Sequence, residues 1–497
     1  MNMNEIFTIR PSSRQLHWQR LEFYGFIHFG MNTMTGREWG TGHEDPARFN
    51  PKHLDAAEWV KVLKQAGMKA VILTCKHHDG FCLWPSRYTK HSVASSPWRG
   101  GQGDLVREVA EACQQAGLKF GVYLSPWDRT EASYGEGQAY DDFYVSQLTE
   151  LLTQYGEIRC VWLDGANGEG PSGKRQRYDW DRYYETIRRL QPQCVISVCG
   201  PDIRWVGNEA GHTRREEWSV VPQALQDAEK TAEKSQQADD PSFARSINSM
   251  EEDLGSREAI VRYGGEWVWY PAEVNTSIRP GWFYHEEEDR QVRSDRELFE
   301  IYLKAVGGNA MFLLNVPPDR DGRIATADRE ALAGLGARIA ELNDPGPMEG
   351  AVWEVSSAAS EGETVNALAG RDLDQGWKPA ESDPEPWVQV RFPTAMTFNA
   401  VILQEHILQG QRVEAFELWA SDGGDELNEK TGNPDEWRLI GEGTIIGHKK
   451  IITLPLMTAR RVKVVFMQYR GYPTLASVRL SLISGSPYQV AGGAKDG

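Results

Sequence analysis

The feature that most constrains the fold is a regular alternation of short apolar segments with amphipathic segments, which continues to about residue 340. The apolar segments are rich in β-branched and aromatic residues, as buried parallel strands are. They lie at 23–29, 69–74, 118–124, 158–163, 194–198 and 310–314, with weaker candidates at 267–270 and 277–278. The intervening segments repeat apolar residues every three or four positions, which is typical of helices. They lie at 54–66, 105–116, 142–155, 180–190, 295–306 and 327–342.

Strand–helix alternation of this length predicts an α/β fold, a TIM-like (β/α)8 barrel. A doubly wound open sheet is the alternative, but no GxGxxG fingerprint follows the first strand. The polar stretch at 224–253 is predicted to be a surface insertion.

The pattern changes after a linker at 343–347 that contains Pro and Gly. Beyond it, apolar and polar residues alternate with period two in short runs separated by turn residues, which predicts half-buried strands. We therefore expect two domains, a barrel at 1–345 and an all-β sandwich at 346–497, with a frayed tail at 487–497.

Charge and cysteine usage exclude some classes of partner. The formal net charge is −17 and the pI about 5.2, whereas a nucleic-acid or anionic-membrane partner requires a basic surface. The 6 cysteines form no CxxC pair or zinc spacing, so free buried thiols in a reducing compartment are expected. No signal-peptide pattern and no apolar segment of membrane-spanning length is visible. A cytoplasmic protein is therefore expected, although a secreted chain whose leader had been trimmed would show the same sequence pattern.

The richest cluster of chemical groups directly follows the apolar strand at 69–74. Residues 76–85 include His77, His78, Asp79, a glycine and two aromatic rings. The ends of strands are where α/β folds place their chemistry. Imidazoles that hydrogen-bond to hydroxyls, together with aromatic faces that stack under C–H groups, suit a sugar. Adjacent histidines chelate a metal poorly, so no metal is expected.

Asp164 is the strongest candidate for catalysis. It ends the apolar strand at 158–163 and precedes a glycine, which in a barrel puts its carboxylate on the catalytic rim. A turn-forming or helix-capping aspartate is the alternative interpretation. The other strand ends favour catalysis, because His28 ends the first strand while Tyr123 and Asp128 end the third.

Hydrolysis of a glycoside with retention needs a second carboxyl group as acid and base. Glu209 lies just beyond the strand at 194–198, between two glycines that allow close approach of a substrate. Glu273 is the rival candidate, and Glu216 and Glu217 are weaker ones. Spacing alone leaves this choice open.

Five ordered motifs together resemble the α-L-fucosidases of glycoside hydrolase family 29. They are 26–30, 38–40, 76–81, 119–127 and 162–165. The first of them carries Phe29 where the family usually has Trp, which is a conservative departure. The resemblance implies a barrel catalytic domain that works by double displacement with retention, without a metal or an organic cofactor.

The family's functional residues carry over by position. Asp164 matches the catalytic nucleophile. In the family, certain residues bind the fucose hydroxyls or line the same pocket. The positions in this chain that match them are His28, Glu38, Trp39, His77 and His78. Tyr123 is expected to contact the substrate as well, since it ends a neighbouring strand.

Two segments resemble the branch of the family that acts on α-1,3/4 linkages of branched, Lewis-type glycans. The first is 207–211, in which Glu209 matches the acid/base of that branch. The second is 277–284, in which Trp282 is expected to form a wall of the fucose pocket.

The second domain resembles a discoidin-type sandwich, also called coagulation factor 5/8 type C, which occurs in many carbohydrate-binding modules. The likeness rests on 366–368, 376–377, 387–390 and 459–464. Whether this domain binds sugar or only packs against the barrel stays open.

Taken together, the sequence predicts an exo-acting α-L-fucosidase whose partners are fucosylated oligosaccharides or glycoconjugates. One alternative is a broad-specificity α-L-fucosidase with Glu273 as acid/base. Others are a retaining hydrolase for another sugar, such as galactose, and a catalytically idle glycan-binding protein. The sequence fixes neither the natural glycan nor the oligomeric state.

Overall fold

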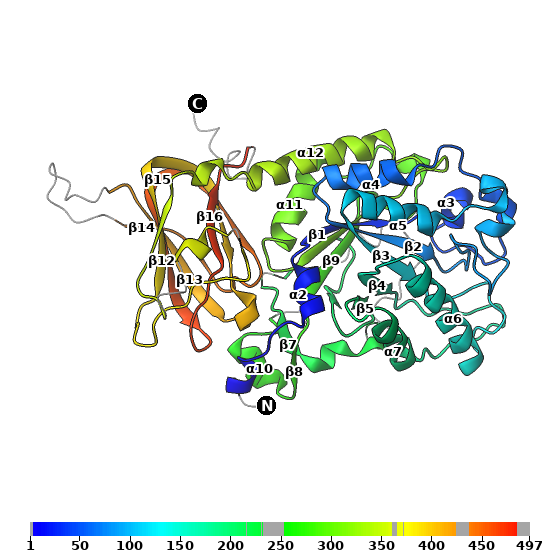
Figure 1. Cartoon of the computed structure of the whole chain (residues 1–497), viewed down its shortest axis with the longest axis horizontal. Helices are drawn as coiled ribbons and strands as arrows, with labels where there is room; N and C mark the ends of the chain where they lie inside the picture. Colours follow the sequence, from blue (N-terminus) through cyan, green and yellow to red (C-terminus); the bar gives the residue numbers. More distant parts are fainter. Residues whose placement is uncertain are drawn as a thin grey trace, which may run out of the picture.

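The computed structural model describes residues 3–214, 216–229, 231, 253–359, 365–370, 372–423 and 437–484. They form two units side by side, a barrel surrounded by helices and a β-sandwich (Figure 1). The predicted insertion at 224–253 lies mostly outside the described residues, and the predicted tail at 487–497 lies wholly outside them.

The barrel is built from eight strands that pair in parallel in the order β5-β4-β3-β2-β1-β10-β9-β6. An isolated parallel bridge between Ser197 and Ile203 brings β5 next to β6, so the sheet nearly closes on itself. The strands are β1 (Phe23–Ile27), β2 (Ala70–Lys76), β3 (Lys119–Leu124), β4 (Cys160–Leu163), β5 (Val195–Val198), β6 (Arg204–Trp205), β9 (Ala272–Ser277) and β10 (Met311–Asn315). The predicted TIM-like fold is therefore confirmed.

Helices cover most of the outer face of the barrel (Figure 1). They are α4 (Ala56–Gln65), α5 (Leu105–Ala116), α6 (Gln138–Gln154), α7 (Trp180–Leu190), α11 (Asp295–Ala305) and α12 (Thr326–Leu342). Three shorter helices, α1 (Met3–Ile6), α2 (Ser13–Gln19) and α3 (Met31–Thr35), come before α4 in the chain. Capping defines the ends of α5, because Asp104 accepts a hydrogen bond at its start and Gly117 takes a left-handed conformation at its end.

The barrel is irregular between β5 and β9. The chain passes from β5 to β6 without a helix and then makes an excursion that contains β7 (Val220–Pro222), α10 (Arg257–Tyr263) and β8 (Trp267–Trp269). β7 and β8 pair with each other as a separate antiparallel sheet. The strand candidate at 267–270 therefore lies outside the barrel, and the candidate at 277–278 is only the end of β9.

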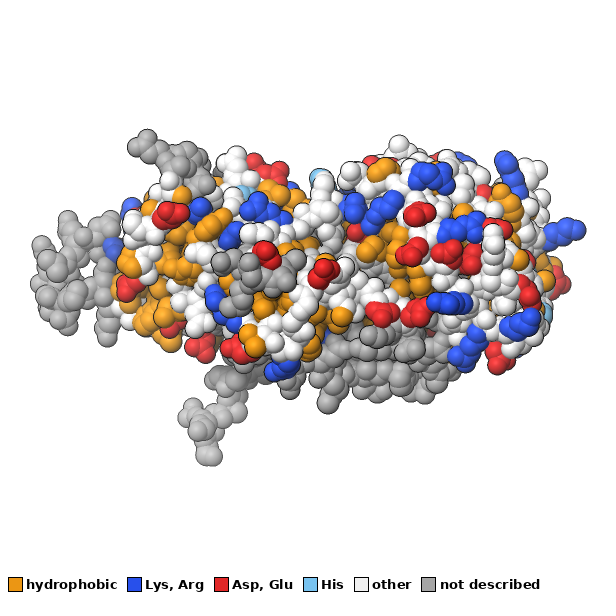
Figure 2. Space-filling model, turned by 90° about the horizontal axis from the view of Figure 1, so that it is seen from below, with side chains coloured by type: hydrophobic (Ala, Val, Ile, Leu, Met, Phe, Trp, Pro, Cys, Tyr) orange, Lys and Arg blue, Asp and Glu red, His pale blue; other side chains and the backbone are white. Residues whose placement is uncertain are grey.

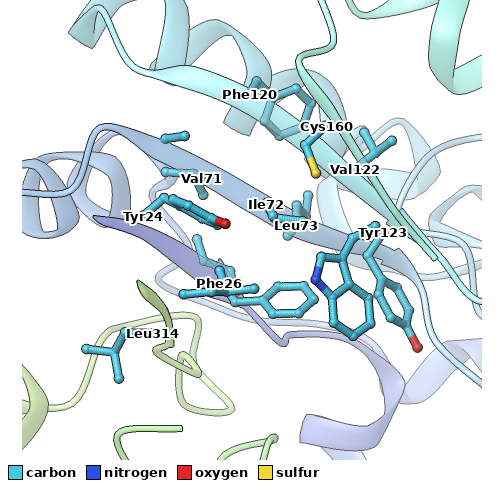
Figure 3. Close-up of a cluster of buried hydrophobic side chains, with 14 of the residues drawn as sticks. Tyr24, Phe26, Val71, Ile72, Leu73, Phe120, Val122, Tyr123, Cys160 and Leu314 are labelled. Carbon is cyan, nitrogen blue, oxygen red and sulfur yellow. The ribbon is translucent and has the colours of Figure 1, made fainter. Parts of the chain in front are cut away.

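Side chains from neighbouring strands fill the barrel interior (Figure 3). Phe26, Ile72 and Cys160 come from β1, β2 and β4 and are at most 1% exposed. Full burial of a side chain such as Phe26 or Ile72 contributes about 1.5–3 kcal/mol. Gly25 lets α4 pack on β1, because a Cβ atom there would lie only 3.0 Å from Leu63 Cδ1 of that helix.

The second unit is an antiparallel sheet of β11 (Val352–Val355), β12 (Trp387–Gln404), β13 (Val413–Ser421), β14 (Arg438–Gly443), β15 (Lys450–Tyr469) and β16 (Ser477–Ser481). The long strands β12 and β15 pair with each other through two register shifts, and such shifts bend a strand pair. Their inward faces enclose a separate core that includes Trp377, Phe398 and Phe416. This architecture confirms the predicted discoidin-like sandwich, whereas the exact division of the chain after residue 345 stays a prediction.

The two units meet at the N-terminal ends of the barrel strands. Glu22, which directly precedes β1, binds Lys449 at 2.6 Å and His448 at 3.0 Å across the interface. Asn309, near the start of β10, accepts a hydrogen bond from the His448 backbone N–H at 2.7 Å, and Ile451 packs into the barrel core. The sandwich thus covers the end of the barrel opposite to the carboxyl ends of its strands.

The molecular surface mixes both signs of charge. On the face seen from below, acidic and basic side chains are interspersed over the barrel (Figure 2). Among the described residues, no helix has the length and apolar character that crossing a membrane requires. All 6 cysteines are buried free thiols.

Candidate active site

The candidate catalytic carboxylate is held at the carboxyl end of β4. Asp164 follows Leu163, and its side chain is 20% exposed. The Tyr123 hydroxyl donates to Asp164 Oδ2 at 2.8 Å, and the Ala166 backbone N–H donates to Oδ1 at 2.8 Å. Both carboxylate oxygens are therefore oriented by the protein while the group stays open to a ligand.

The three histidines named from the sequence lie together beside Asp164. The ring centroids of His28 and His77 are 5.6 Å apart, and those of His77 and His78 are 4.1 Å apart. Burial lowers the pKa of His28 to about 3 and that of His78 to about 4, and it holds the pKa of His77 well below its ordinary value. All three imidazoles are consequently neutral near pH 7.

Hydrogen bonds assign the tautomers of His28 and His77. His28 Nδ1 lies 2.8 Å from Asn315 Oδ1, which accepts, so the His28 Nε2 atom carries a lone pair. His77 Nδ1 accepts from the Asn32 amide at 3.2 Å, so its Nε2 atom carries the proton. The two rings thus offer one acceptor and one donor, which suits hydroxyl groups that both donate and accept.

His78 is fixed in the same way. Its Nδ1 atom lies 2.7 Å from the Ser125 hydroxyl, which itself donates to the Trp127 carbonyl at 2.6 Å. Ser125 therefore accepts from His78 Nδ1–H. His78 Nε2 lies 3.9 Å from Asp164 Oδ2, which joins the histidine cluster to the candidate nucleophile.

Aromatic rings form much of the lining of the site. Tyr123 stacks on His77 at 5.6 Å with an interplanar angle of 13°, and Trp39 contacts Trp127 edge-on at 5.4 Å. Trp282 lies 5.1 Å from His28. The structure thus brings the predicted residues Trp39, Tyr123 and Trp282 to the histidine cluster.

Trp127 and Trp162 were not among the predicted site residues. Trp127 packs 4.8 Å from His78, and Trp162 stacks 5.5 Å from Tyr123. Their position offered a signal, because each tryptophan lies at or just past the end of a barrel strand. A ring there can line the mouth of the barrel.

Glu38 binds a loop of the protein itself. Its carboxylate accepts from the backbone N–H groups of Trp282 at 2.9 Å and Phe283 at 3.2 Å, and it contacts His285 Nε2 at 2.7 Å. The hydrogen bond to Glu38 raises the pKa of His285. Glu38 therefore fixes the loop that carries Trp282, and its predicted contact with a sugar stays a prediction.

Glu209 lies on a tight loop after β6. Gly207 and Gly211 take left-handed conformations with φ of +107° and +85°, which favour glycine. Between them, the Asn208 side chain accepts from the backbone N–H groups of Ala210 and His212 at 3.1 and 3.2 Å. The Trp282 indole N–H donates to Glu209 Oε2 at 3.1 Å, so the loop presents this carboxylate beside the histidine cluster.

The other acidic candidates occupy different surroundings. Glu273 is 0% exposed within the barrel, and burial raises its pKa to about 7 despite three hydrogen bonds. Glu217 is buried in ion pairs with Arg204 at 2.6 Å and Arg214 at 3.0 Å. Glu209 is thus the candidate that combines partial exposure with a hydrogen bond from Trp282, which lies beside His28.

A buried ion pair lies next to the histidine cluster, because Lys76 directly precedes His77. Lys76 Nζ lies 2.8 Å from Asp128 Oδ2 and 2.9 Å from Gln147 Oε1, with the lysine side chain 0% exposed. Asp128 also accepts from the Thr130 backbone N–H at 2.9 Å. Asp128, which ends the third strand region, is therefore structural rather than open to a ligand.

The assembled groups are suited to nucleophilic and acid–base chemistry on a hydroxyl-rich ligand. Within the part of the chain that the structure describes, no group of His, Cys, Asp or Glu side chains is arranged to hold a metal ion. Two partly exposed carboxylates, Asp164 and Glu209, lie close to the neutral imidazoles and aromatic rings. Carboxylate pairs of this kind cleave glycosidic bonds.

The chain is similar over most of its length to known α-L-fucosidases. Residues 15–341 match the Alpha-L-fucosidase family, and residues 352–479 match the F5/8 type C domain. Alpha-L-fucosidase 1 of Arabidopsis thaliana is 40% identical over 485 residues, which cover 95% of this chain and 87% of the relative.

Solved structures show the same likeness. A glycoside hydrolase 29 family member from an unknown rumen bacterium is 36% identical, with a TM-score of 0.74. The match covers 97% of this chain and 79% of the bacterial chain. A family 29 fucosidase from Ruminococcus gnavus, solved in complex with fucose, is 27% identical with a TM-score of 0.81 and covers 96% of both chains.

Proposed function

Because this chain belongs to the α-L-fucosidases of glycoside hydrolase family 29, we propose that it is a retaining, exo-acting enzyme for α-1,3/4-linked L-fucose. Its substrates in this proposal are branched, Lewis-type glycans. The observation that carries the proposal is the pair of partly exposed carboxylates at a cluster of neutral histidines. Asp164 lies 3.9 Å from His78, and Glu209 accepts from Trp282, whose ring lies 5.1 Å from that of His28.

In the first step, Asp164 attacks the anomeric carbon while Glu209 protonates the departing glycosidic oxygen. A covalent fucosyl–enzyme intermediate forms on the Asp164 carboxylate. In the second step, Glu209 takes a proton from water, which attacks the same carbon and releases fucose with its configuration retained.

The surrounding side chains hold the sugar in this proposal. His28 Nε2 accepts from one hydroxyl, whereas His77 Nε2–H donates to another, as their assigned tautomers allow. Trp39, Tyr123 and Trp282 supply apolar faces that pack against the ring. These contacts orient the anomeric carbon toward Asp164, and such orientation lowers the entropic cost of reaching the transition state.

The proposed α-1,3/4 preference rests on the resemblance of the segments 207–211 and 277–284 to the branch of the family with that preference. The first segment also carries the proposed acid/base. Its two left-handed glycines and the Asn208 side chain fix Glu209 at one place on the rim. Glu273 is a less suitable acid, because its carboxyl group is 0% exposed and a glycosidic oxygen would have to enter the barrel interior to reach it.

The linkage preference is tested by measuring fucose release from a Lewis-type trisaccharide, an α-1,2-fucosylated glycan and an aryl fucoside in parallel. We expect the trisaccharide to be preferred. Strong activity on the aryl fucoside with none on the trisaccharide would favour a broad-specificity enzyme. Binding of the glycans without turnover of any of them would favour a glycan-binding protein instead.

The residue roles are tested with Asp164→Ala and Glu209→Ala, with Glu216→Ala as a control at a half-buried glutamate near the same loop. Loss of the general acid is expected to lower kcat on the trisaccharide about 10²- to 10⁴-fold. The loss should be smaller for an aryl fucoside with a good leaving group, and azide should restore turnover of Glu209→Ala. NMR of the first product formed should detect the α-anomer, and initial release of the β-anomer would contradict retention.

A further inference from the structure

We propose that Glu273 is a positioning residue of the active site, which fixes the Tyr123 hydroxyl on Asp164 through the Trp162 indole. This inference rests on the proposed role of Asp164 as nucleophile. It assigns a task to a buried carboxyl group that the proposed reaction does not otherwise use.

Glu273 lies on β9 inside the barrel, with 0% of its surface exposed. Its Oε2 atom accepts from the Tyr24 hydroxyl at 2.5 Å and from the Ser197 hydroxyl at 3.3 Å, and its Oε1 atom accepts from Trp162 Nε1 at 2.8 Å. Among the described residues, no ion pair joins a lysine, arginine or histidine to Glu273. Neutral donors alone therefore compensate the loss of water around this group.

The three donors, Tyr24, Trp162 and Ser197, come from the separate barrel strands β1, β4 and β5. Tyr123 and Trp162 are register partners on β3 and β4, and Trp162 and Ser197 are register partners on β4 and β5. Tyr24 and Tyr123 lie in the same buried cluster (Figure 3). Glu273 on β9 thus links its own strand to three other strands inside the barrel.

Three contacts lead from the Glu273 carboxyl group to the nucleophile, and the first is the hydrogen bond from Trp162 Nε1 at 2.8 Å. The Trp162 ring stacks on the Tyr123 ring at 5.5 Å with an angle of 29°, while His77 stacks on Tyr123 at 5.6 Å. Tyr123 is therefore held between two rings, and its hydroxyl donates to Asp164 at 2.8 Å.

The Trp162 indole has one donor, and in the buried site that donor needs an acceptor. If Glu273 could not accept, the indole would turn or shift to find another partner, and the face against which Tyr123 packs would move with it. A displacement of about 1 Å at a catalytic group can cost about a hundredfold in rate. The carboxyl group therefore acts on Asp164 through packing and not by touching the substrate.

The test compares Glu273→Leu, Glu273→Gln and Trp162→Phe in turnover of an aryl fucoside. Glu273→Leu removes the acceptor, so kcat is expected to fall about a hundredfold with KM changed far less. Glu273→Gln keeps an oxygen that can face the indole, so it should recover most of that loss. Glu273→Leu combined with Trp162→Phe should be no slower than the slower single variant, since both break the same link.

Tyr24→Phe and Ser197→Ala are matched controls, because each removes a donor to the other carboxyl oxygen and leaves the Trp162 bond in place. They should lower Tm while kcat stays close to the wild-type value. Wild-type kcat in a folded Glu273→Leu variant would overturn the proposal, as would full additivity of Glu273→Leu and Trp162→Phe.

A readout that does not depend on activity separates this proposal from the proposed function. The indole N–H resonance of Trp162 is identified by its loss in Trp162→Phe. We expect Glu273→Leu to move that resonance upfield and to speed its exchange with solvent. An unchanged resonance would overturn the link between Glu273 and Trp162, even in a preparation that hydrolyses no fucoside.

Discussion

Replacement of Glu22 by glutamine tests whether the sandwich stabilises the barrel. Glu22 is 7% exposed, and it binds Lys449 at 2.6 Å and His448 at 3.0 Å from the other domain. Lys449 is itself only 5% exposed. Glu22→Gln therefore leaves a lysine buried at the interface without its carboxylate.

Removing one partner of a buried ion pair costs about 3–5 kcal/mol. Unfolding entropy of about 2.1 cal/mol/K per residue gives roughly 1 kcal/mol/K for a chain of 497 residues. If both domains unfold together, Glu22→Gln should lower Tm by about 3–5 °C. Calorimetry should still show one transition, because the interface couples the domains.

The effect should depend on pH in a defined direction. Burial alone would raise the pKa of Glu22, but Lys449, Lys69 and His448 together hold it well below its ordinary value. A carboxylate whose pKa is lower in the folded state stabilises the fold at pH values above its unfolded-state pKa of about 4.3. That stabilisation is lost as the pH falls through the folded-state pKa. The difference between wild type and Glu22→Gln should thus be constant from pH 8 to about 5 and should shrink below about pH 4.

Two comparisons make the result decisive. Glu136→Gln removes an exposed pair with Lys174, whose side chains are 49% and 58% exposed, and should cost less than about 1 kcal/mol. Combining Glu22→Gln with Lys449→Met should recover part of the loss, because neither charge then stays buried alone. If Glu22→Gln costs no more than Glu136→Gln, the reasoning about this interface is wrong.

Three further changes probe the supports of the site. Trp282→Phe keeps a ring but removes the donor to Glu209, so kcat should fall about tenfold in steady-state assays with a glycan substrate, which corresponds to about 1.4 kcal/mol of transition-state stabilisation. Asn208→Ala removes the hydrogen bonds that hold the loop carrying Glu209. It should lower kcat on the same glycan clearly, while Tm changes little. Lys76→Met leaves Asp128 buried without its cation, so urea unfolding should report a loss of about 3–5 kcal/mol.

Most barrel strands were predictable because their burial is uniform. β2 and β10 are buried at every position, and parallel strands covered on both faces appear in sequence as continuous apolar runs. β9 was harder to recognise, because its buried residues include Glu273, Asn275 and Thr276. A strand with buried polar side chains cannot be recognised from the hydrophobicity of its sequence alone.

β6 escaped prediction for a different reason. It consists only of Arg204 and Trp205, which is too short to give any periodicity. By contrast, Trp267–Trp269 looked like a barrel strand, because it is apolar and aromatic, yet it pairs with β7 outside the barrel. Local composition predicts that a segment is extended, whereas the strand with which it pairs depends on the whole fold.

The candidate site was predictable where chemistry lies at strand ends, as at His28, His77 and Asp164. The network that fixes those residues was not. The acceptor for the Trp162 indole, for example, is Glu273, which is 111 residues away in sequence. Such contacts depend on barrel closure, which no short segment encodes.

The bond between Glu38 and the backbone of the loop at 281–285 has a consequence for engineering. Grafting this loop from a related enzyme, in order to change the leaving glycan that is accepted, would separate it from an anchor 244 residues earlier in the chain. A graft should therefore transfer residue 38 together with the loop. Otherwise Trp282 would lose its fixed place beside Glu209, and the chimera would recognise fewer substrates instead of different ones.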